Sequence, residues 1–327
     1  MTRTEFQHAI AIAMPVYNGI RFINQAINSI QNQTDPNWLL FISDNASTDG
    51  TIQLLKDLEH SYDSRIKIYF QKKNLGIYGN LNYLTSVINY NFIHILCADD
   101  QFSDPNALKR LRLKLPFNNS VGAVRWNSTS KDCVIIPGQE SPVAAQLYFA
   151  LHGNPLGNLS NITYKKSALQ DCGMFDTNYP FVGDFATWAN VALRYNIILY
   201  PETIVTVRQH EHSASNYLNE GGELYLETSD LLLRLLRNVV SQTMCDALIL
   251  RITLSVVYDS QYRFSAVIKA LRGNSTYLRT LDIAGQKNSF ILNVHQLWMV
   301  AVLTLGGRLF KSELMALTMK RYEKAID

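Results

Sequence analysis

The sequence has few cysteines and no two of them close together. Cys97, Cys133, Cys172 and Cys245 are far apart in the 327 residues. This spacing excludes a CxxC zinc cluster and gives no indication of a disulfide framework. The apolar run before Pro15 has only about six residues, too short for a secretory signal peptide. We therefore expect a protein of the reducing cytoplasm.

The net charge is also small, because 30 basic and 27 acidic residues leave a net charge of +3. So small an excess gives no reason to expect nucleic acid as a partner. The charge is unevenly distributed, with 17 basic and 20 acidic residues (net −3) in 1–227 and 13 and 7 (net +6) in 228–327. A hydrophobic content of 47% is that of a folded globular chain, and the length predicts more than one core.

Strand and helix patterns alternate along the first third of the chain. Short apolar runs predict strands, and apolar residues at helical spacing predict helices between them. The alternation predicts an α/β fold with a mostly parallel sheet and helices on both faces. In such sheets ligands bind beyond the carboxyl ends of the strands. The strands are expected at 9–14, 38–43, 65–70 and 92–96, and the helices at 22–33, from 51, at 81–88 and at 107–115.

The pattern becomes helical from about Glu223, with helices expected at 231–240, 248–258, 264–271 and 290–305. We therefore predict two parts, a catalytic domain at 1–220 and a C-terminal helical region at 221–327. Residues 288–307 carry no formal charge, but polar residues in their first half argue against a membrane span. This segment is either a core helix or a helix lying on a membrane surface, near the basic residues Arg308, Lys311 and Lys320.

The loops after the first two predicted strands are candidates for binding a ring. Asp44 ends the second strand, where its carboxylate could accept a hydrogen bond from a nucleobase N–H. Pro15 and Tyr17 could form a wall of the same pocket, with the tyrosine stacked on the base. Asp49 precedes an apolar periodic run and is better explained as a cap for the helix from Thr51.

Asp99 and Asp100 directly follow the fourth predicted strand. Adjacent carboxylates repel each other, so the pair is explained if a cation lies between it and another anion, such as a diphosphate. The alternative is a solvated turn before the helix that starts after Asp104-Pro105. The residues in the loops after the other strands decide between a cation site and a solvated turn.

Four segments, each after a strand, together resemble a known family. They are Pro15-Val16-Tyr17-Asn18, the segment from Ser43 to Thr51 (SDNASTDGT), Asn74-Leu75-Gly76 and Ala98-Asp99-Asp100. In this order they are similar to the nucleotide-sugar-dependent glycosyltransferases of family 2, which have the GT-A fold. The resemblance spans about residues 8–215. It implies that Pro15, Tyr17, Asp44, Asn74, Gly76 and Asp99 contact the donor nucleotide.

Two later segments extend the resemblance. Asp184 matches the acid that the family uses as general base of an inverting transfer, although a helix cap would also explain an aspartate there. His210, in Val207 to Ser215 (VRQHEHSAS), matches a histidine that can bind metal or diphosphate, with His212 as the weaker alternative. The resemblance thus implies Mn²⁺ or Mg²⁺ held by Asp99, Asp100 and His210, with the role of each aspartate left open.

The sequence departs from the family pattern at two positions. Gly183 stands where the family has the first of two acids, and Cys97 stands where many relatives have an acid that contacts the ribose. These departures keep a catalytically inactive nucleotide-sugar-binding scaffold as an alternative. A sugar nucleotidyltransferase is a second alternative, although the N-terminus has no glycine-rich phosphate loop with a lysine.

The resemblance implies transfer of a monosaccharide from a nucleoside diphosphate sugar, UDP-sugar favoured, to a hydroxyl with inversion. The expected setting is bacterial surface polysaccharide or glycoconjugate synthesis, with a glycan or lipid-linked acceptor. The region 134–160 is expected to border the acceptor groove. The basic C-terminal region suggests contact with the inner face of the cell membrane or with a partner enzyme.

Overall fold

A computed structural model describes residues 9–60, 63–116, 118–210, 223–239, 253, 263–264, 268, 271–273 and 311–323. Contacts divide the chain into two units. The first comprises Met1–Glu140 and Asn154–Gln209, and the second comprises Ser141–Gly153 and His210–Asp327. The expected helices at 248–258, 264–271 and 290–305 and the uncharged stretch 288–307 lie largely or wholly outside the described residues.

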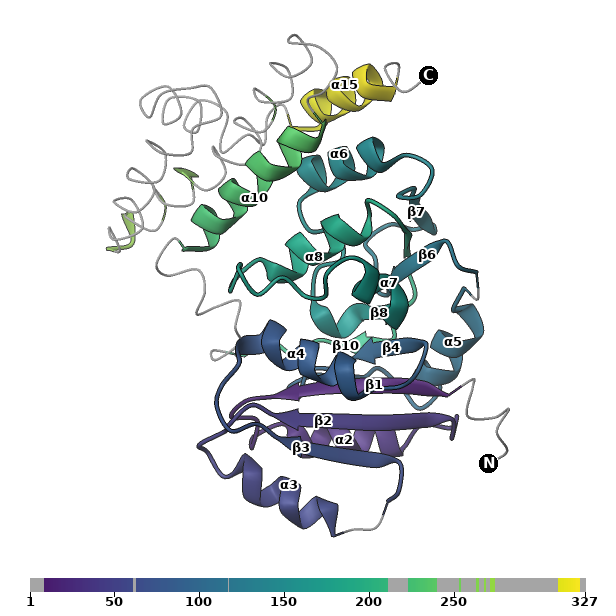
Figure 1. The fold of residues 1–327 in the computed structure, drawn as a ribbon, viewed down its shortest axis with the longest axis vertical. Coiled ribbons are helices and arrows are strands. Elements are labelled where there is room, and N and C mark those ends of the chain that lie inside the picture. Colours follow the sequence, from purple (N-terminus) through teal and green to yellow (C-terminus); the bar gives the residue numbers. More distant parts are fainter. Residues whose placement is uncertain are drawn as a thin grey trace. The chain divides into compact units, whose positions relative to one another are not determined.

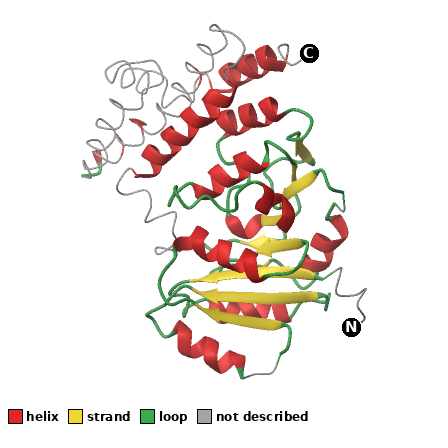
Figure 2. Cartoon of the chain, viewed as in Figure 1, coloured by secondary structure: helices red, strands yellow, loops and turns green. Residues whose placement is uncertain are grey.

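The first unit is built on an eight-stranded sheet in the order β3-β2-β1-β4-β8-β6-β9-β7. The pairs among β1 to β4 are parallel, whereas β8 runs antiparallel to both β4 and β6. The predicted mostly parallel α/β sheet is therefore confirmed (Figures 1 and 2). The strands are β1 (Ile10–Val16), β2 (Trp38–Asp44), β3 (Ile66–Phe70), β4 (Phe92–Ile95), β6 (Val121–Arg125), β7 (Val134–Ile136), β8 (Ile162–Lys165) and β9 (Asn196–Leu199).

Helices pack on both faces of the sheet, and the side chains of β1 differ between the two faces. Its even-numbered residues, from Ile10 to Val16, pack into one apolar cluster with α2 (Ile23–Gln31). Its odd-numbered residues include Ala11 and Ala13, whose small side chains let α4 (Gly76–Val87) pack closely on the other face (Figure 1). The remaining helices of this unit are α3 (Thr51–Glu59), α5 (Ala107–Lys114), α7 (Lys166–Asp171), α8 (Gly183–Val191) and the 3₁₀ helix η1 (Leu159–Asn161).

Two predicted boundaries in the first unit were wrong, and in the second unit the helix expected at 231–240 begins earlier, at Glu223. The first strand does not end at Pro15 but continues to Val16, with Pro15 opposite Ser43 of β2. Since β4 pairs only with residues 11–13 of β1, no neighbouring strand requires the missing N–H of the proline. The helix expected from residue 81 begins at Gly76, whose positive φ of 72° turns the chain directly from the preceding loop into α4.

A second sheet of two short strands, β5 (Gln101–Phe102) and β10 (Val205–Thr206), joins the segment after β4 to the end of the first unit. This pairing brings the Asp99-Asp100 loop beside residues 207–209, more than 100 positions later in the sequence.

The described part of the second unit is helical. It contains α6 (Pro142–His152), α10 (Glu223–Val239) and α15 (Lys311–Glu323), and α6 packs against the other two. Within the described residues, no helix has both the length and the apolar content needed to span a bilayer. The domain boundary at 220 falls in the undescribed residues 211–222, and it remains a prediction.

Candidate active site

The loops after β1 and β2 are hydrogen-bonded to each other at the carboxyl edge of the sheet. Asn18, at a φ of 52°, donates its backbone N–H to the Ser47 hydroxyl and accepts from the Thr48 N–H through its side chain, both at 2.8 Å. The Asn45 N–H donates to the carbonyl of Val16 at 2.8 Å. These bonds fix the pair of loops from which Tyr17 and Asp44 extend.

Asp44 is fully buried at the end of β2. Its Oδ2 accepts a hydrogen bond from the Ser47 N–H at 3.0 Å, but its Oδ1 has no partner within the described residues. A buried carboxylate oxygen without a partner is costly, so a ligand N–H would complete this site. Tyr17 is 51% exposed beside it, whereas Pro15 is buried in β1.

Asp49 has the architectural role expected of it. Its Oδ1 accepts from the backbone N–H of Thr51 at 3.1 Å, in the first turn of α3. Its Oδ2 accepts from the Ile20 N–H, also at 3.1 Å, and so ties α3 to the loop after β1.

The loop after β3 is held by Asn45. The Asn45 side chain donates to Asn74 Oδ1 at 2.8 Å and accepts from the Leu75 N–H at 2.8 Å. Asn74 also accepts from the Gly76 N–H. Asn74 and Gly76 are exposed at the start of α4, where helix amides can bind an anion. Their predicted contact with the donor stays a prediction.

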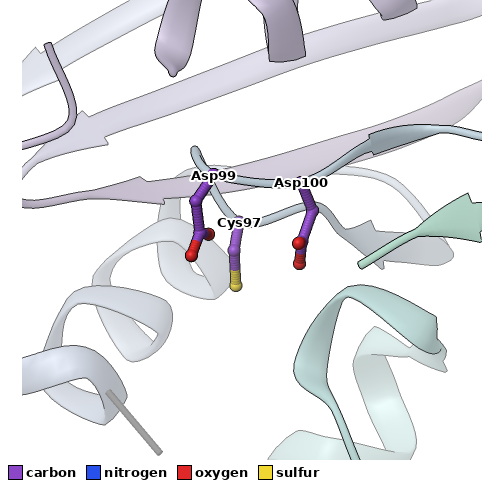
Figure 3. Close-up of side chains that lie close together, drawn as sticks. All are labelled: Cys97, Asp99 and Asp100. Atoms are coloured by element: carbon purple, nitrogen blue, oxygen red, sulfur yellow. The ribbon is translucent and has the colours of Figure 1, made fainter. Parts of the chain in front are cut away.

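Asp99, Asp100 and Cys97 form a cluster in the loop after β4. One oxygen from each aspartate and the sulfur of Cys97 all lie within 4.8 Å of one another. Figure 3 shows the three side chains extending from the loop in the same direction, with the thiol between the carboxylates. Among the described residues this is the only group of three or more such ligands placed to hold a metal ion.

Asp100 is buried and held from two sides. Its Oδ1 accepts the backbone N–H of Arg208 at 2.8 Å, and Ser160 stabilises its charged form. Burial nevertheless raises the pKa of Asp100 to about 6, with a further contribution from Asp99. Burial also raises the pKa of the Cys97 thiol, and both aspartates raise it further. Both shifts disfavour the charged forms of these groups, and a bound dication would oppose them by stabilising the charged forms. The donor set therefore fits a divalent cation.

Asp184 lies in the first turn of α8, which begins at Gly183. Its Oδ1 accepts from the Tyr78 hydroxyl at 3.2 Å and its Oδ2 from Asn154 Nδ2 at 2.7 Å. Burial raises the pKa of Asp184 to about 6, against the lowering effect of the Phe185 N–H and these two donors. A carboxylate so placed can take up a proton near neutral pH. The N-cap position of α8 is Val182 and has no side-chain cap hydrogen bond, so Asp184 lies in the first turn and is not the cap residue.

The loop that carries Asn154 is itself anchored to the sheet. Arg125, at the end of β6, donates to the carbonyl of Pro155. Gly157 lies beside the Arg125 guanidinium at a φ of 63°, a conformation that favours glycine. The orientation of Asp184 thus depends on a fixed loop within the region 134–160.

His210 is half-buried and belongs to the second unit, so the structure does not relate it to Asp99 and Asp100. Its role as a metal ligand stays a prediction, and His212 lies outside the described residues. Lys72 and Lys73, in the loop before Asn74, are exposed.

Four further residues around the site were not singled out from the sequence: Tyr78, Asn154, Ser160 and Arg208. Asn154 and Ser160 lie in the region expected to border the acceptor groove, and Arg208 lies in the recognised segment before His210. Tyr78 lay just before the predicted helix at 81–88, in a segment that no motif marks. The register of α4 places its hydroxyl at Asp184, 106 positions later.

Residues 11–159 match the model of the family described as Glycosyl transferase family 2. An uncharacterized glycosyltransferase of Haemophilus influenzae is 26% identical over 227 residues, which cover 64% of this chain and 68% of the relative. WfgD of Escherichia coli, a UDP-Glc:alpha-D-GlcNAc-diphosphoundecaprenol beta-1,3-glucosyltransferase, is 37% identical over 93 residues, covering 28% of this chain and 36% of the relative. These matches assign residues 11–159 to glycosyltransferase family 2.

Solved structures agree with this fold. S. aureus TarS (residues 1–349) with UDP-GlcNAc matches with a TM-score of 0.61 at 16% identity, covering 97% of this chain and 92% of that one. The mannosyltransferase PcManGT of Pyrobaculum calidifontis, in complex with GDP-Man and Mn²⁺, matches with a TM-score of 0.56 at 16% identity, covering 95% and 85%. At such low identity the likeness shows the fold, which is GT-A.

Proposed function

We propose that this glycosyltransferase moves a monosaccharide from a nucleoside diphosphate sugar to an acceptor hydroxyl with inversion at the anomeric carbon. The observation that carries the proposal is the Asp99-Asp100 pair at the carboxyl edge of the sheet, where Asp44 also ends its strand with one buried oxygen that has no partner among the described residues. The Asp44 carboxylate suits a hydrogen bond from a nucleobase, and the Asp99-Asp100 pair suits the cation of a diphosphate.

UDP-sugar is the favoured donor. WfgD is named for a UDP-glucose donor, and TarS was solved with UDP-GlcNAc, although PcManGT was solved with GDP-Man. The free oxygen of Asp44 is an acceptor, which suits the ring N–H of uracil. Tyr17 would stack on this ring from the loop after β1, and Asn74, Gly76 and Asp99 would contact the rest of the nucleotide.

Mn²⁺ or Mg²⁺ would be held by Asp99 and Asp100, with His210 as a further ligand. When bound, such an ion neutralises charge that develops on the departing diphosphate. The protein contributes the fixed placement of its ligands, because the Arg208 N–H and Ser160 hold Asp100 in place.

Asp184 would act as the general base. Its carboxylate removes the proton from the acceptor hydroxyl while that oxygen attacks the anomeric carbon and the bond to the diphosphate breaks. A single displacement of this kind inverts the anomeric centre. Tyr78 and Asn154 hold the two carboxylate oxygens in place.

The acceptor is proposed to be a glycan or a lipid-linked glycan of bacterial surface polysaccharide or glycoconjugate synthesis. WfgD is named for a diphosphoundecaprenol acceptor. The net charge of +6 in residues 228–327 would favour contact with anionic lipid at the inner face of the membrane. Cosedimentation with anionic vesicles tests this contact, which should weaken in the variant Arg308→Gln, Lys311→Gln, Lys320→Gln and with added salt.

A screen of nucleoside diphosphate sugars for hydrolysis without acceptor tests the main proposal. We expect slow release of UDP with Mn²⁺, abolished in the double variant Asp99→Ala, Asp100→Ala. Binding of the donor without any turnover, even with acceptor extracts, would favour the inactive scaffold instead. Release of pyrophosphate from a nucleoside triphosphate and a sugar phosphate would favour the nucleotidyltransferase.

A further inference from the structure

We propose that Cys97 is a thiolate ligand of the cation at Asp99 and Asp100, and that it makes the site prefer thiophilic cations over Mg²⁺. The inference rests on the metal site of the proposed function and concerns a residue at which this chain departs from the family pattern.

The geometry supports a three-ligand site. The sulfur of Cys97 and one oxygen of each aspartate all lie within 4.8 Å of one another, a separation that lets a single ion contact all three. The thiol extends from the loop in the same direction as the carboxylates and lies between them (Figure 3). A metal held by the two aspartates would therefore lie within reach of the sulfur.

The backbone of the loop keeps the thiol in this place. The N–H of Cys97 donates to the Ser160 hydroxyl at 2.9 Å, and its carbonyl accepts from the N–H of Asp100 at 3.0 Å. Ser160, in η1, also stabilises the charged form of Asp100. One buried hydroxyl therefore contacts both the backbone of Cys97 and the carboxylate of Asp100.

Ligand chemistry then sets the preference of the site. Mg²⁺ binds oxygen ligands and accepts sulfur poorly, whereas thiolate favours softer ions such as Zn²⁺, Co²⁺ and Cd²⁺. An aspartate at position 97 would give an all-oxygen set. The exchange of acid for thiol thus moves the preference from Mg²⁺ toward Mn²⁺, Co²⁺ and Cd²⁺, in increasing order.

Absorption spectroscopy of the full chain with Co²⁺ and UDP tests the inference. Calorimetry first establishes that Co²⁺ binds. We expect the wild type to show a sulfur-to-cobalt charge-transfer band in the near ultraviolet. Cys97→Ser should lose the band and still bind Co²⁺ through the aspartates, and Cys133→Ser, which removes an exposed thiol, should keep it.

The second measurement is the ratio of Cd²⁺ to Mg²⁺ affinity. It should fall by about tenfold or more in Cys97→Asp and stay unchanged in Cys133→Ser. The wild-type spectrum alone can overturn the inference, so the test does not depend on the stability of a variant. Bound Co²⁺ without the band, or a band that survives in Cys97→Ser, contradicts thiolate ligation but leaves the proposed function standing. Failure of Mn²⁺ and Co²⁺ to bind at all contradicts both.

Discussion

The ring of Tyr78 occupies the space in which a side chain at position 183 would begin. A Cβ built on Gly183 would lie 2.6 Å from the Tyr78 ring and would also overlap the carbonyl oxygen of Asp176. The glycine that replaces the first acid of the family pattern is therefore matched to Tyr78, which in turn donates to Asp184. The departure at 183 is a local repacking around the proposed base, and it gives no reason to regard the site as inactive.

Gly183→Ala should accordingly displace Tyr78 and disturb Asp184. Overpacking of this kind costs about 1–3 kcal/mol of unfolding free energy, and we expect kcat to fall as well. Gly79→Ala is the matched control, because its Cβ would meet only the side chain of Leu75, at 3.0 Å. Thermal melts and donor turnover should separate the two variants. Equal turnover in Gly183→Ala and wild type would show that Tyr78 does not position the base.

Removal of either donor to Asp184 should shift the pH dependence of catalysis. Tyr78→Phe and Asn154→Ala each remove a hydrogen bond that stabilises the charged carboxylate, so the pKa of Asp184 should rise above about 6. Since the base acts when deprotonated, the rising limb of kcat/KM should move to higher pH. Tyr83→Phe, on the same helix, should leave the limb in place. A limb that stays fixed or moves to lower pH in both variants would exclude Asp184 as the group observed.

Substitution of Asp44 should mainly weaken nucleotide binding, whereas substitution of Asp49 should mainly lower the stability of the fold. In Asp44→Asn the amide nitrogen faces either the Ser47 N–H or the ligand N–H, a donor against a donor in both orientations. We expect the binding free energy of UDP to weaken by about 1–3 kcal/mol. Asp49→Asn weakens the bonds to Ile20 and Thr51 and should lower the melting temperature more than the UDP affinity. Calorimetry that finds equal UDP affinity in Asp44→Asn and wild type would remove Asp44 from the donor site.

His94 should make the fold sensitive to acid. It is fully buried in β4, with Nδ1 at 2.9 Å from the Thr163 hydroxyl, and burial lowers its pKa to about 3. An unfolded histidine titrates near 6.5, so only the unfolded state takes up this proton between the two values. Stability then falls with pH by about 1.4 kcal/mol per unit below 6.5.

Urea unfolding at pH 6.5 and 4.5 measures this effect. The wild type should lose about 2–3 kcal/mol more than His94→Gln across this interval, and His60→Gln, at an exposed site, should behave like the wild type. The opposite contributions of Asp100 and Asp184, whose pKa values are raised, are common to all three proteins and cancel in the comparison. Equal losses in wild type and His94→Gln would contradict a neutral buried histidine.

The parallel half of the fold could be predicted from sequence because each of its strands is a short apolar run followed by a polar loop. The boundaries that were wrong are those that depend on neighbours. Pro15 remains in β1 because β4 has already ended its pairing, a fact of the sheet and not of the local sequence. The strands from 121 to 199 were not assigned, since they are three to five residues long and pair out of sequence order.

The acidic residues of the candidate site could be selected from sequence because they follow strands whose ends share one edge. Their partners could not. The Tyr78 hydroxyl reaches Asp184 across 106 positions, and the Arg208 N–H reaches Asp100 across 108. Such contacts arise from the packing of α4 on the sheet and from the pairing of β5 with β10, which no local pattern encodes.

Titration of UDP into the full chain, with Mn²⁺ and after its removal by chelation, tests the central claim most directly. The claim is that Asp99 and Asp100 hold a cation that binds the diphosphate of the donor. The account predicts UDP binding that requires Mn²⁺ in the wild type and is lost in Asp99→Ala, Asp100→Ala, with cooperative unfolding showing that the variant is folded. Equal UDP affinity with and without Mn²⁺, or in the double variant, would contradict it.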